Sequence, residues 1–208
     1  MKKKTVAMIG IIIIVIILTI SVYFIIIRCD KFPKNFEIDE VVIKCKQNTM
    51  LGGFHIIIYG NGAAFFLDER YNEDICWKDN ETNDYFCFDA RYGKLSNDTI
   101  QNLIDAFEKS GFYCLNNYYN DTTGRTECNY DYINITINNE TKIVRDECQN
   151  APSSFRNLFN QILKSVQKLP KVNENEIEIF SNEISKLDIP YLNENYVLYC
   201  LNSTIKKT

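Results

Sequence analysis

The chain has 208 residues, and its 23 lysine and arginine residues against 27 aspartate and glutamate residues give a net charge of −4. A mildly acidic chain without a basic stripe is not typical of a nucleic-acid-binding protein, because it has little with which to neutralise phosphates. The roughly 180 residues that follow the apolar N-terminal stretch are enough to bury one hydrophobic core.

That apolar stretch runs from Val6 to Ile27, contains 22 residues without a charge, and is half isoleucine. As a helix it would be roughly 30 Å long, which matches the hydrocarbon core of a bilayer. A cleaved signal peptide would have a shorter apolar run and a small-residue cleavage site. A lipoprotein anchor at Cys29 is disfavoured because Arg28 stands where a small residue would be expected. A buried core helix is disfavoured because apolar residues lie on all sides of the stretch, which suits a bilayer better. We therefore expect an uncleaved single span that places the protein in a membrane.

Basic residues lie at both ends of the span, so they do not decide its orientation. The cysteines indicate on which side of the membrane the rest of the chain lies. All eight follow the span. Cys76 and Cys87 flank a polar stretch, and Cys128 and Cys148 bracket Asn138-Asn139, so we predict a hairpin disulfide for each pair. The remaining four, for which three connectivities are open, are Cys29, Cys45, Cys114 and Cys200.

Six N-x-S/T sequons follow the span as well, and we predict glycosylation at Asn80, Asn97, Asn120, Asn134, Asn139 and Asn202. Disulfides and sequons together favour an oxidising, extracytoplasmic compartment. We expect a cell-membrane protein with a cytoplasmic N-terminus and an extracytoplasmic C-terminal domain.

The folded part is predicted from hydrophobic periodicity and turn signals. Strands are expected at residues 41–46, 54–59, 63–67, 130–137 and 141–145, helices at 96–110 and 152–169, a cysteine-closed excursion at 68–93, and weaker elements at 177–180 (strand), 183–187 (helix) and 196–201 (strand). The fold class is α+β: an N-terminal transmembrane helix, then a mainly antiparallel sheet packed with two amphipathic helices. The expected divisions are residues 1–28 (tip and anchor), 29–38 (stalk), 39–170 (domain) and 171–208 (acidic extension).

The candidate binding residues lie in the loop of residues 116–126. Tyr118, Tyr119 and Arg125 are residue types that protein interfaces favour, although any long loop of a tyrosine-rich chain would contain some of them. His55 falls on an apolar strand face and is expected to be partly buried and hydrogen-bonded, without a catalytic partner.

The order of elements over residues 38–169 resembles the emfourin family, inhibitors of thermolysin-type metalloproteases, and similar uncharacterised envelope and lipoprotein domains. The resemblance is carried by Leu95, Gly111-Phe112-Tyr113-Cys114-Leu115, residues 130–137 and residues 152–163. It implies a protease as one kind of partner. No inhibitory residue can be transferred, because none matches position by position.

No catalytic, cofactor or metal site is expected. The chain has no G-x-S-x-G, H-E-x-x-H or phosphate-binding loop, and its single histidine with no C-x-x-C pair disfavours zinc. A Cys-His hydrolase would need a spare cysteine near His55, and an even set of disulfides leaves none. The main hypothesis is a membrane-anchored, extracytoplasmic binding module for a protein partner or a protease. The alternatives are a passive glycosylated envelope protein and an envelope hydrolase.

Overall fold

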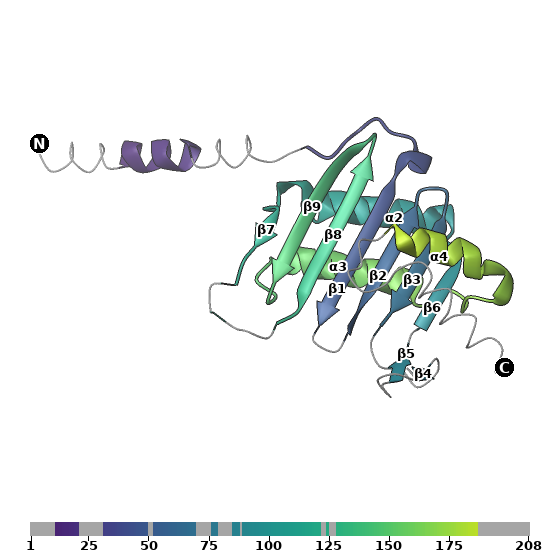
Figure 1. Ribbon diagram of the computed structural model, residues 1–208. Helices are drawn as coiled ribbons and strands as arrows, with labels where there is room; N and C mark the ends of the chain where they lie inside the picture. The colour runs from purple at the N-terminus through teal and green to yellow at the C-terminus, as the bar shows by residue number, and fades with distance from the viewer. Residues whose placement is uncertain are drawn as a thin grey trace, which may run out of the picture.

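The computed structural model describes residues 11–20, 31–49, 52–69, 76–78, 85–87, 89–121, 124 and 128–186 (Figure 1). Residues 11–20, inside the predicted span, are helical and exposed. Within the described residues, no helix has both the length and the apolar character needed to cross a membrane. The rest of the predicted span, residues 6–10 and 21–27, lies outside that part of the chain.

A seven-stranded sheet forms the centre of the fold. Its strand order is β6 (Asp89–Lys94), β3 (Ala63–Asp68), β2 (Gly52–Tyr59), β1 (Val42–Thr49), β8 (Tyr130–Ile137), β9 (Glu140–Glu147), β7 (Tyr118–Tyr119). All neighbours are antiparallel except β7, which runs parallel to β9. The α+β class with a mainly antiparallel sheet is therefore confirmed. The excursion at 68–93 contains a separate two-stranded pair, β4 (Cys76–Lys78) and β5 (Tyr85–Cys87), and ends in β6.

Two helices, α2 (Asn97–Lys109) and α3 (Ser153–Val166), lie on one face of the sheet (Figure 1). The Ser96 hydroxyl accepts the backbone N–H of Thr99 and caps α2, as its sequence predicts. Each helix buries one apolar stripe, and these stripes pack on the alternate strand residues that share this face, forming the main core. The described core includes Ile43, Phe54, Ile56, Ile133, Ile135, Phe107 and Phe155.

A third helix, α4 (Ile177–Ser185), lies on the opposite face, in front of the sheet in Figure 1. Phe180 is fully buried there, with its ring centroid 6.1 Å from that of Phe65. The predicted strand at 177–180 is therefore wrong. The final strand predicted at 196–201 lies outside the described residues. Backbone hydrogen bonds from Tyr92 to Pro170 and from Val172 to Ala90 attach the segment before α4 to β6, so the packed structure continues past residue 170.

Both predicted hairpin turns are present, with different geometry. Asn138 and Asn139 have φ of 52° and 64°, the left-handed pair that a two-residue turn requires. In the turn at residues 60–62, only Gly62 has a positive φ, at 92°. A Cβ on Gly60 would lie 1.6 Å from the carbonyl oxygen of Ile38, so this turn packs against the 3₁₀ helix η1 (Ile38–Glu40) in a way that only glycine allows.

The described part of the predicted stalk is packed onto the domain. Phe32 contacts the ring of Tyr113 edge-to-face at 5.2 Å, and Phe36 joins the same apolar cluster. The Asn138 side chain donates a 2.8 Å hydrogen bond to the carbonyl oxygen of Asn35. The chain from residue 32 onward is therefore part of the folded unit.

Candidate binding site

Five polar side chains form one row across neighbouring strands on the face of the sheet that carries α4. The strand register pairs His55 with Lys46, Lys46 with Tyr132, Tyr132 with Arg145, and Arg145 with Tyr118. Directly paired residues project to the same side of a sheet, and strands lie about 4.8 Å apart, so the row extends for roughly 19 Å. We call these five residues the cation–tyrosine row.

The row lies mostly beyond the cover of α4, because no described helix lies over β1, β8 and β9 on this face (Figure 1). Lys46 and Tyr132 are half-buried and Arg145 is exposed. Neither Lys46 nor Arg145 has a salt-bridge partner within the residues that the structure describes. Two free cations on either side of a tyrosine are suited to receive an anionic ligand.

The two tyrosines predicted as binding residues project to opposite faces of the sheet. Tyr118, paired with Arg145, is 46% exposed and belongs to the row. Its hydroxyl donates to Glu147, and this bond raises the pKa of Tyr118 to about 12. Tyr119, paired with the buried Asp146, packs against the core, and its hydroxyl accepts the backbone N–H of Asn116. The third predicted residue, Arg125, lies outside the described part of the chain.

His55 forms the inner end of the row. It is 1% exposed, so the predicted burial is present, but neither ring nitrogen makes a hydrogen bond within the described structure. The nearest charged group is Glu69, whose Oε1 lies 3.5 Å from Nε2 with poor hydrogen-bond geometry. The expected hydrogen bond of His55 is therefore absent from the described structure. A buried polar ring without a partner is a group that a bound ligand could satisfy.

Cys45 corrects the expectation that no cysteine remains spare. It is free and buried, and it neighbours Lys46, the strand partner of His55. Alternation nevertheless places its side chain in the core on the helix-covered face, so the sheet separates it from His55. Burial, and secondarily the charge of Asp131, raises the pKa of the Cys45 thiol. A protonated thiol on the wrong face cannot serve as a nucleophile for His55 to activate.

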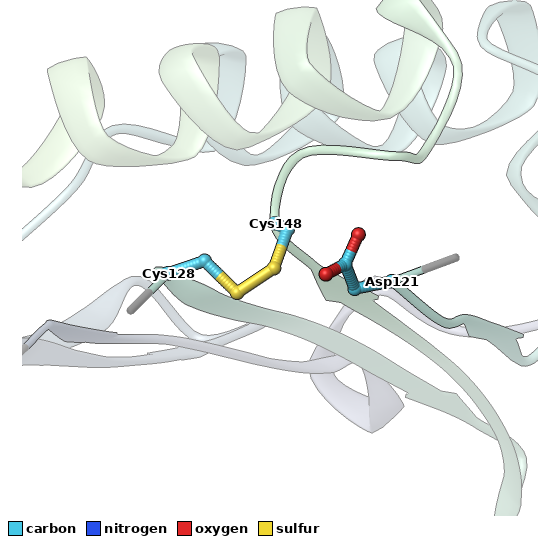
Figure 2. Close-up of side chains that lie close together, drawn as sticks. All are labelled: Asp121, Cys128 and Cys148. Carbon is cyan, nitrogen blue, oxygen red and sulfur yellow. A yellow bond between two sulfur atoms is a disulfide. The ribbon is translucent and has the colours of Figure 1, made fainter. Parts of the chain in front are cut away.

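Cys128 and Cys148 form a disulfide with a Cα–Cα distance of 4.8 Å, the pairing that their positions around Asn138-Asn139 predict (Figure 2). The carboxylate of Asp121 lies beside them, and its oxygen and the two sulfurs are within 4.8 Å of one another (Figure 2). Metal ions bind cysteine as thiolate, so this cluster is not a metal centre while the disulfide is intact.

The other cysteines are described less completely. Cys76 lies directly opposite Cys87 in the β4–β5 pair, and their disulfide stays a prediction. Cys114 is disulfide-bonded to a cysteine whose side chain lies outside the described part of the chain.

The described sequons differ in their surroundings. Asn97, Asn120 and Asn139 are exposed, whereas Asn134 is half-buried and donates a hydrogen bond to the hydroxyl of Tyr132, in the row itself. A glycan on Asn134 would therefore project from the same face as the row. Asn80 and Asn202 lie outside the described residues, and use of all six sequons stays a prediction.

A cavity of about 440 Å³ lies between α2 and α3, on the side of the sheet opposite the row. Its charged residues are already partnered: Asp105 accepts from Gln101 at 2.8 Å and from Lys109 at 3.4 Å, which lowers the pKa of its carboxyl. Because these charges satisfy one another, we place the candidate site at the row.

Three residues of the row, Lys46, Tyr132 and Arg145, are not among the site residues expected from the sequence. The alternation of residues 41–46 does put Lys44 and Lys46 on the polar face of their strand. The alternation does not show which strands pair or in which register, and it is this pairing that aligns residues from five strands.

Taken together, the fold and the site define an α+β domain that presents a polar, cation-bearing sheet face and no visible catalytic constellation within the described residues. A family model for a domain of unknown function (DUF6438) matches residues 53–166, more than half of the chain. The chain therefore belongs to this family. No curated protein matches it. The matched span runs from β2 to the end of α3 and includes four of the five row residues, with Lys46 outside it. The resemblance to emfourins is tested by neither finding and stays a prediction.

Proposed function

We propose that this protein is a membrane-anchored, extracytoplasmic binding module without catalytic activity, and that the cation–tyrosine row receives an acidic segment of a protein partner. The observation that carries the proposal is the pair of cations, Lys46 and Arg145, that flank Tyr132 without a carboxylate partner in the described structure.

Charge complementarity selects the class of partner. The chain as a whole is acidic, with a net charge of −4, so a surface with unpaired cations is a local departure from its average. Tyrosine and arginine are the residue types that contribute most binding energy at protein interfaces. A row about 19 Å long matches roughly six residues of an extended peptide. A nucleic acid would need a longer basic surface than this.

The cellular setting of the proposal comes from the sequence. The stretch of residues 6–27 has the length and composition of a membrane span, and the cysteines and sequons that follow it suit an oxidising compartment. A protease with an acidic surface segment is one partner that would fit, in keeping with the resemblance to emfourins.

A passive envelope protein is the competing function. It has no need for unpaired cations beside tyrosines, so charge reversal in the row should leave all of its properties unchanged. The two functions therefore differ in one measurable outcome.

The test uses the full chain in a maltoside detergent and a fluorescent oligo-glutamate peptide as the probe, followed by fluorescence anisotropy. We expect salt-sensitive binding that is lost in the double variant Lys46→Glu, Arg145→Glu. The matched control is Lys164→Glu, Lys168→Glu, which changes the charge equally at two exposed positions in and just after α3, on the helix-covered side. Equal binding by both double variants, or no binding by the unmodified chain, would contradict the proposal.

A further inference from the structure

A cavity of about 380 Å³ opens where the row meets the end of α4. The side chains that line it on this face are three lysines, one arginine, the row histidine and two tyrosines: Lys44, Lys46, Lys186, Arg145, His55, Tyr130 and Tyr132. A cavity of this size can hold a small chemical group, but it is too small for a peptide segment.

His55, in the lining of this cavity, is a buried polar residue whose ring has no hydrogen-bond partner in the described structure. It is 1% exposed. A buried polar group without a partner is destabilising, so such groups in folded proteins normally have a ligand, ion or water against them. Glu69, at 3.5 Å from Nε2, does not meet the need of Nδ1. His55 lines the cavity, so a ligand bound there would lie against this unsatisfied ring.

The balance of charge identifies the ligand as an anion. Four cationic side chains line the cavity. Two described carboxylates lie beside its lining: Glu183, which pairs with Lys186 and accepts the hydroxyl of Tyr59, and Glu69, whose Oε1 lies 3.5 Å from Nε2 of His55. Burial acts to raise the pKa of Glu183, but the bonds from Lys186 and Tyr59, with the charge of Lys44 as a smaller contribution, outweigh it and lower that pKa. Two carboxylates against four cations leave an excess of about two positive charges, more than a single carboxylate ligand would balance.

The donors also favour a particular shape. Ammonium groups of lysine donate in many directions from flexible stems, and a tetrahedral oxyanion with three free oxygens can accept from several of them at once. A planar carboxylate has two oxygens and is better matched by the fork of a single arginine.

We propose that this cavity is a binding site for one tetrahedral oxyanion, a phosphoryl or sulfuryl ester group, held by Lys44, Lys46 and Lys186 and by a ring nitrogen of His55. The site deepens the proposed function: the row contacts an acidic segment, and the cavity takes a doubly charged group that the segment carries. It is a binding site only, and no bond of the ester is broken.

His55 is the single histidine of the chain, so its imidazole signal in an NMR spectrum is unambiguous. The test titrates inorganic phosphate, sulfate or acetate into full-length protein that carries ¹³C-labelled histidine and no histidine tag, in a phosphate-free maltoside detergent. We expect a saturable shift of the His55 signal with phosphate and with sulfate, and about tenfold weaker binding of acetate. The comparison of phosphate with sulfate shows which ester the site prefers.

Two variants separate this site from the row. Lys44→Met and Lys186→Met each remove a charge-assisted bond in the cavity, outside the row, and we expect about tenfold weaker phosphate binding. Lys168→Met, at an exposed position beyond α3, is the control and should bind as the unmodified chain does. Oligo-glutamate binding in the three variants should change much less.

The outcomes are distinguishable. If phosphate and sulfate give no saturable shift, bind no better than acetate, or bind equally to the Lys44→Met and Lys186→Met variants, the oxyanion site is wrong. If oligo-glutamate still binds through the row in that case, the proposed function stands alone. If phosphate binds and oligo-glutamate does not, the oxyanion site stands and the acidic-segment function fails.

Discussion

Two aspartates that face each other across neighbouring strands are the least expected residues of the core. Asp131 of β8 lies opposite Asp146 of β9, with exposures of 6% and 0%. Asp131 accepts from Gln47 at 2.8 Å, and Asp146 accepts the backbone N–H of Ala151 at 2.8 Å and so fixes the turn before α3. The second oxygen of Asp146 has no partner in the described structure. Burial, as the largest cause, raises the pKa of both carboxyls, and Arg156 partly offsets it.

This pair predicts an unusual pH dependence of stability. With pKa values above the ordinary 3.8, the folded state holds these protons more tightly than the unfolded state does. Their contribution to the free energy of unfolding is therefore largest below about pH 4 and falls as the pH rises through the native pKa values. Replacing Asp131→Asn keeps the acceptor for Gln47 and removes the charge. We expect it to raise the free energy of unfolding at pH 7, by on the order of 1 kcal/mol, and to change it little at pH 4.

Urea unfolding of the two proteins at a series of pH values measures this difference. The control Asp39→Asn alters an exposed carboxyl of η1 and should leave the pH profile unchanged. A variant that is destabilised equally at every pH would show that the Asp131 charge is not the source of the effect.

At the scale of elements, the two residues of β7 have different roles: one packs on the core and the other lies on the proposed binding face. Tyr119 is packed on the core and Tyr118 is on the open face, although the strand contains these two residues alone. We expect Tyr119→Ala to lower the free energy of unfolding by about 2 kcal/mol, because it removes buried ring area and a hydrogen bond. Tyr118→Ala should change it by less than about 0.5 kcal/mol and should weaken oligo-glutamate binding.

Chemical denaturation and fluorescence anisotropy on the two single variants check this division. A double variant would mix the effects and could not be interpreted. If Tyr119→Ala proved harmless to stability while Tyr118→Ala unfolded the protein, the assignment of the two faces would be reversed.

The elements that the sequence predicts well are those whose signals are local. Both α2 and α3 have an apolar stripe at helical spacing with a defined start, and β8 alternates cleanly around the Asn138-Asn139 turn. By contrast, β7 exists only because backbone groups of β9 are there to pair with it, as in the bond from Arg145 N–H to the carbonyl of Asn117. In α4, the alternating start Ile-Glu-Ile-Phe fits a strand as well as a helix, and only the contact of Phe180 with Phe65 decides between them.

The site was less accessible to sequence reasoning than the fold. Tyr118 was identified by residue type, and His55 was seen as an apolar-face residue, but the line that joins them passes through Lys46, Tyr132 and Arg145. Those residues come from strands up to about 100 positions apart in the chain, and pairing register is a tertiary property that local periodicity does not contain.

At the scale of the whole molecule, the described part of the predicted stalk is packed on the domain. Phe32 and Phe36 lie 6.1 Å apart between ring centroids, and both are partly buried against the main apolar core. The double change Phe32→Ala, Phe36→Ala should lower the free energy of unfolding by about 2 kcal/mol or more and should detach residues 31–37 from the domain.

Hydrogen exchange of the backbone amides that follow, residues 38–41, reports this detachment, and thermal unfolding reports the loss of stability. The matched control Lys31→Ala, Lys34→Ala alters two exposed residues of the same segment and should affect neither measurement. Unchanged exchange in the phenylalanine variant would mean that the stalk is a free tether.

The cation–tyrosine row is assembled from residues of five strands, so it exists only when the sheet is folded in its native register. No linear peptide taken from this chain reproduces it, so an antibody raised against the row would bind only folded protein. A single inserted residue in β1 or β8 would turn Lys46 or Tyr132 toward the core and leave a gap in the middle of the surface. Such an insertion therefore offers a way to abolish recognition while most of the secondary structure is retained.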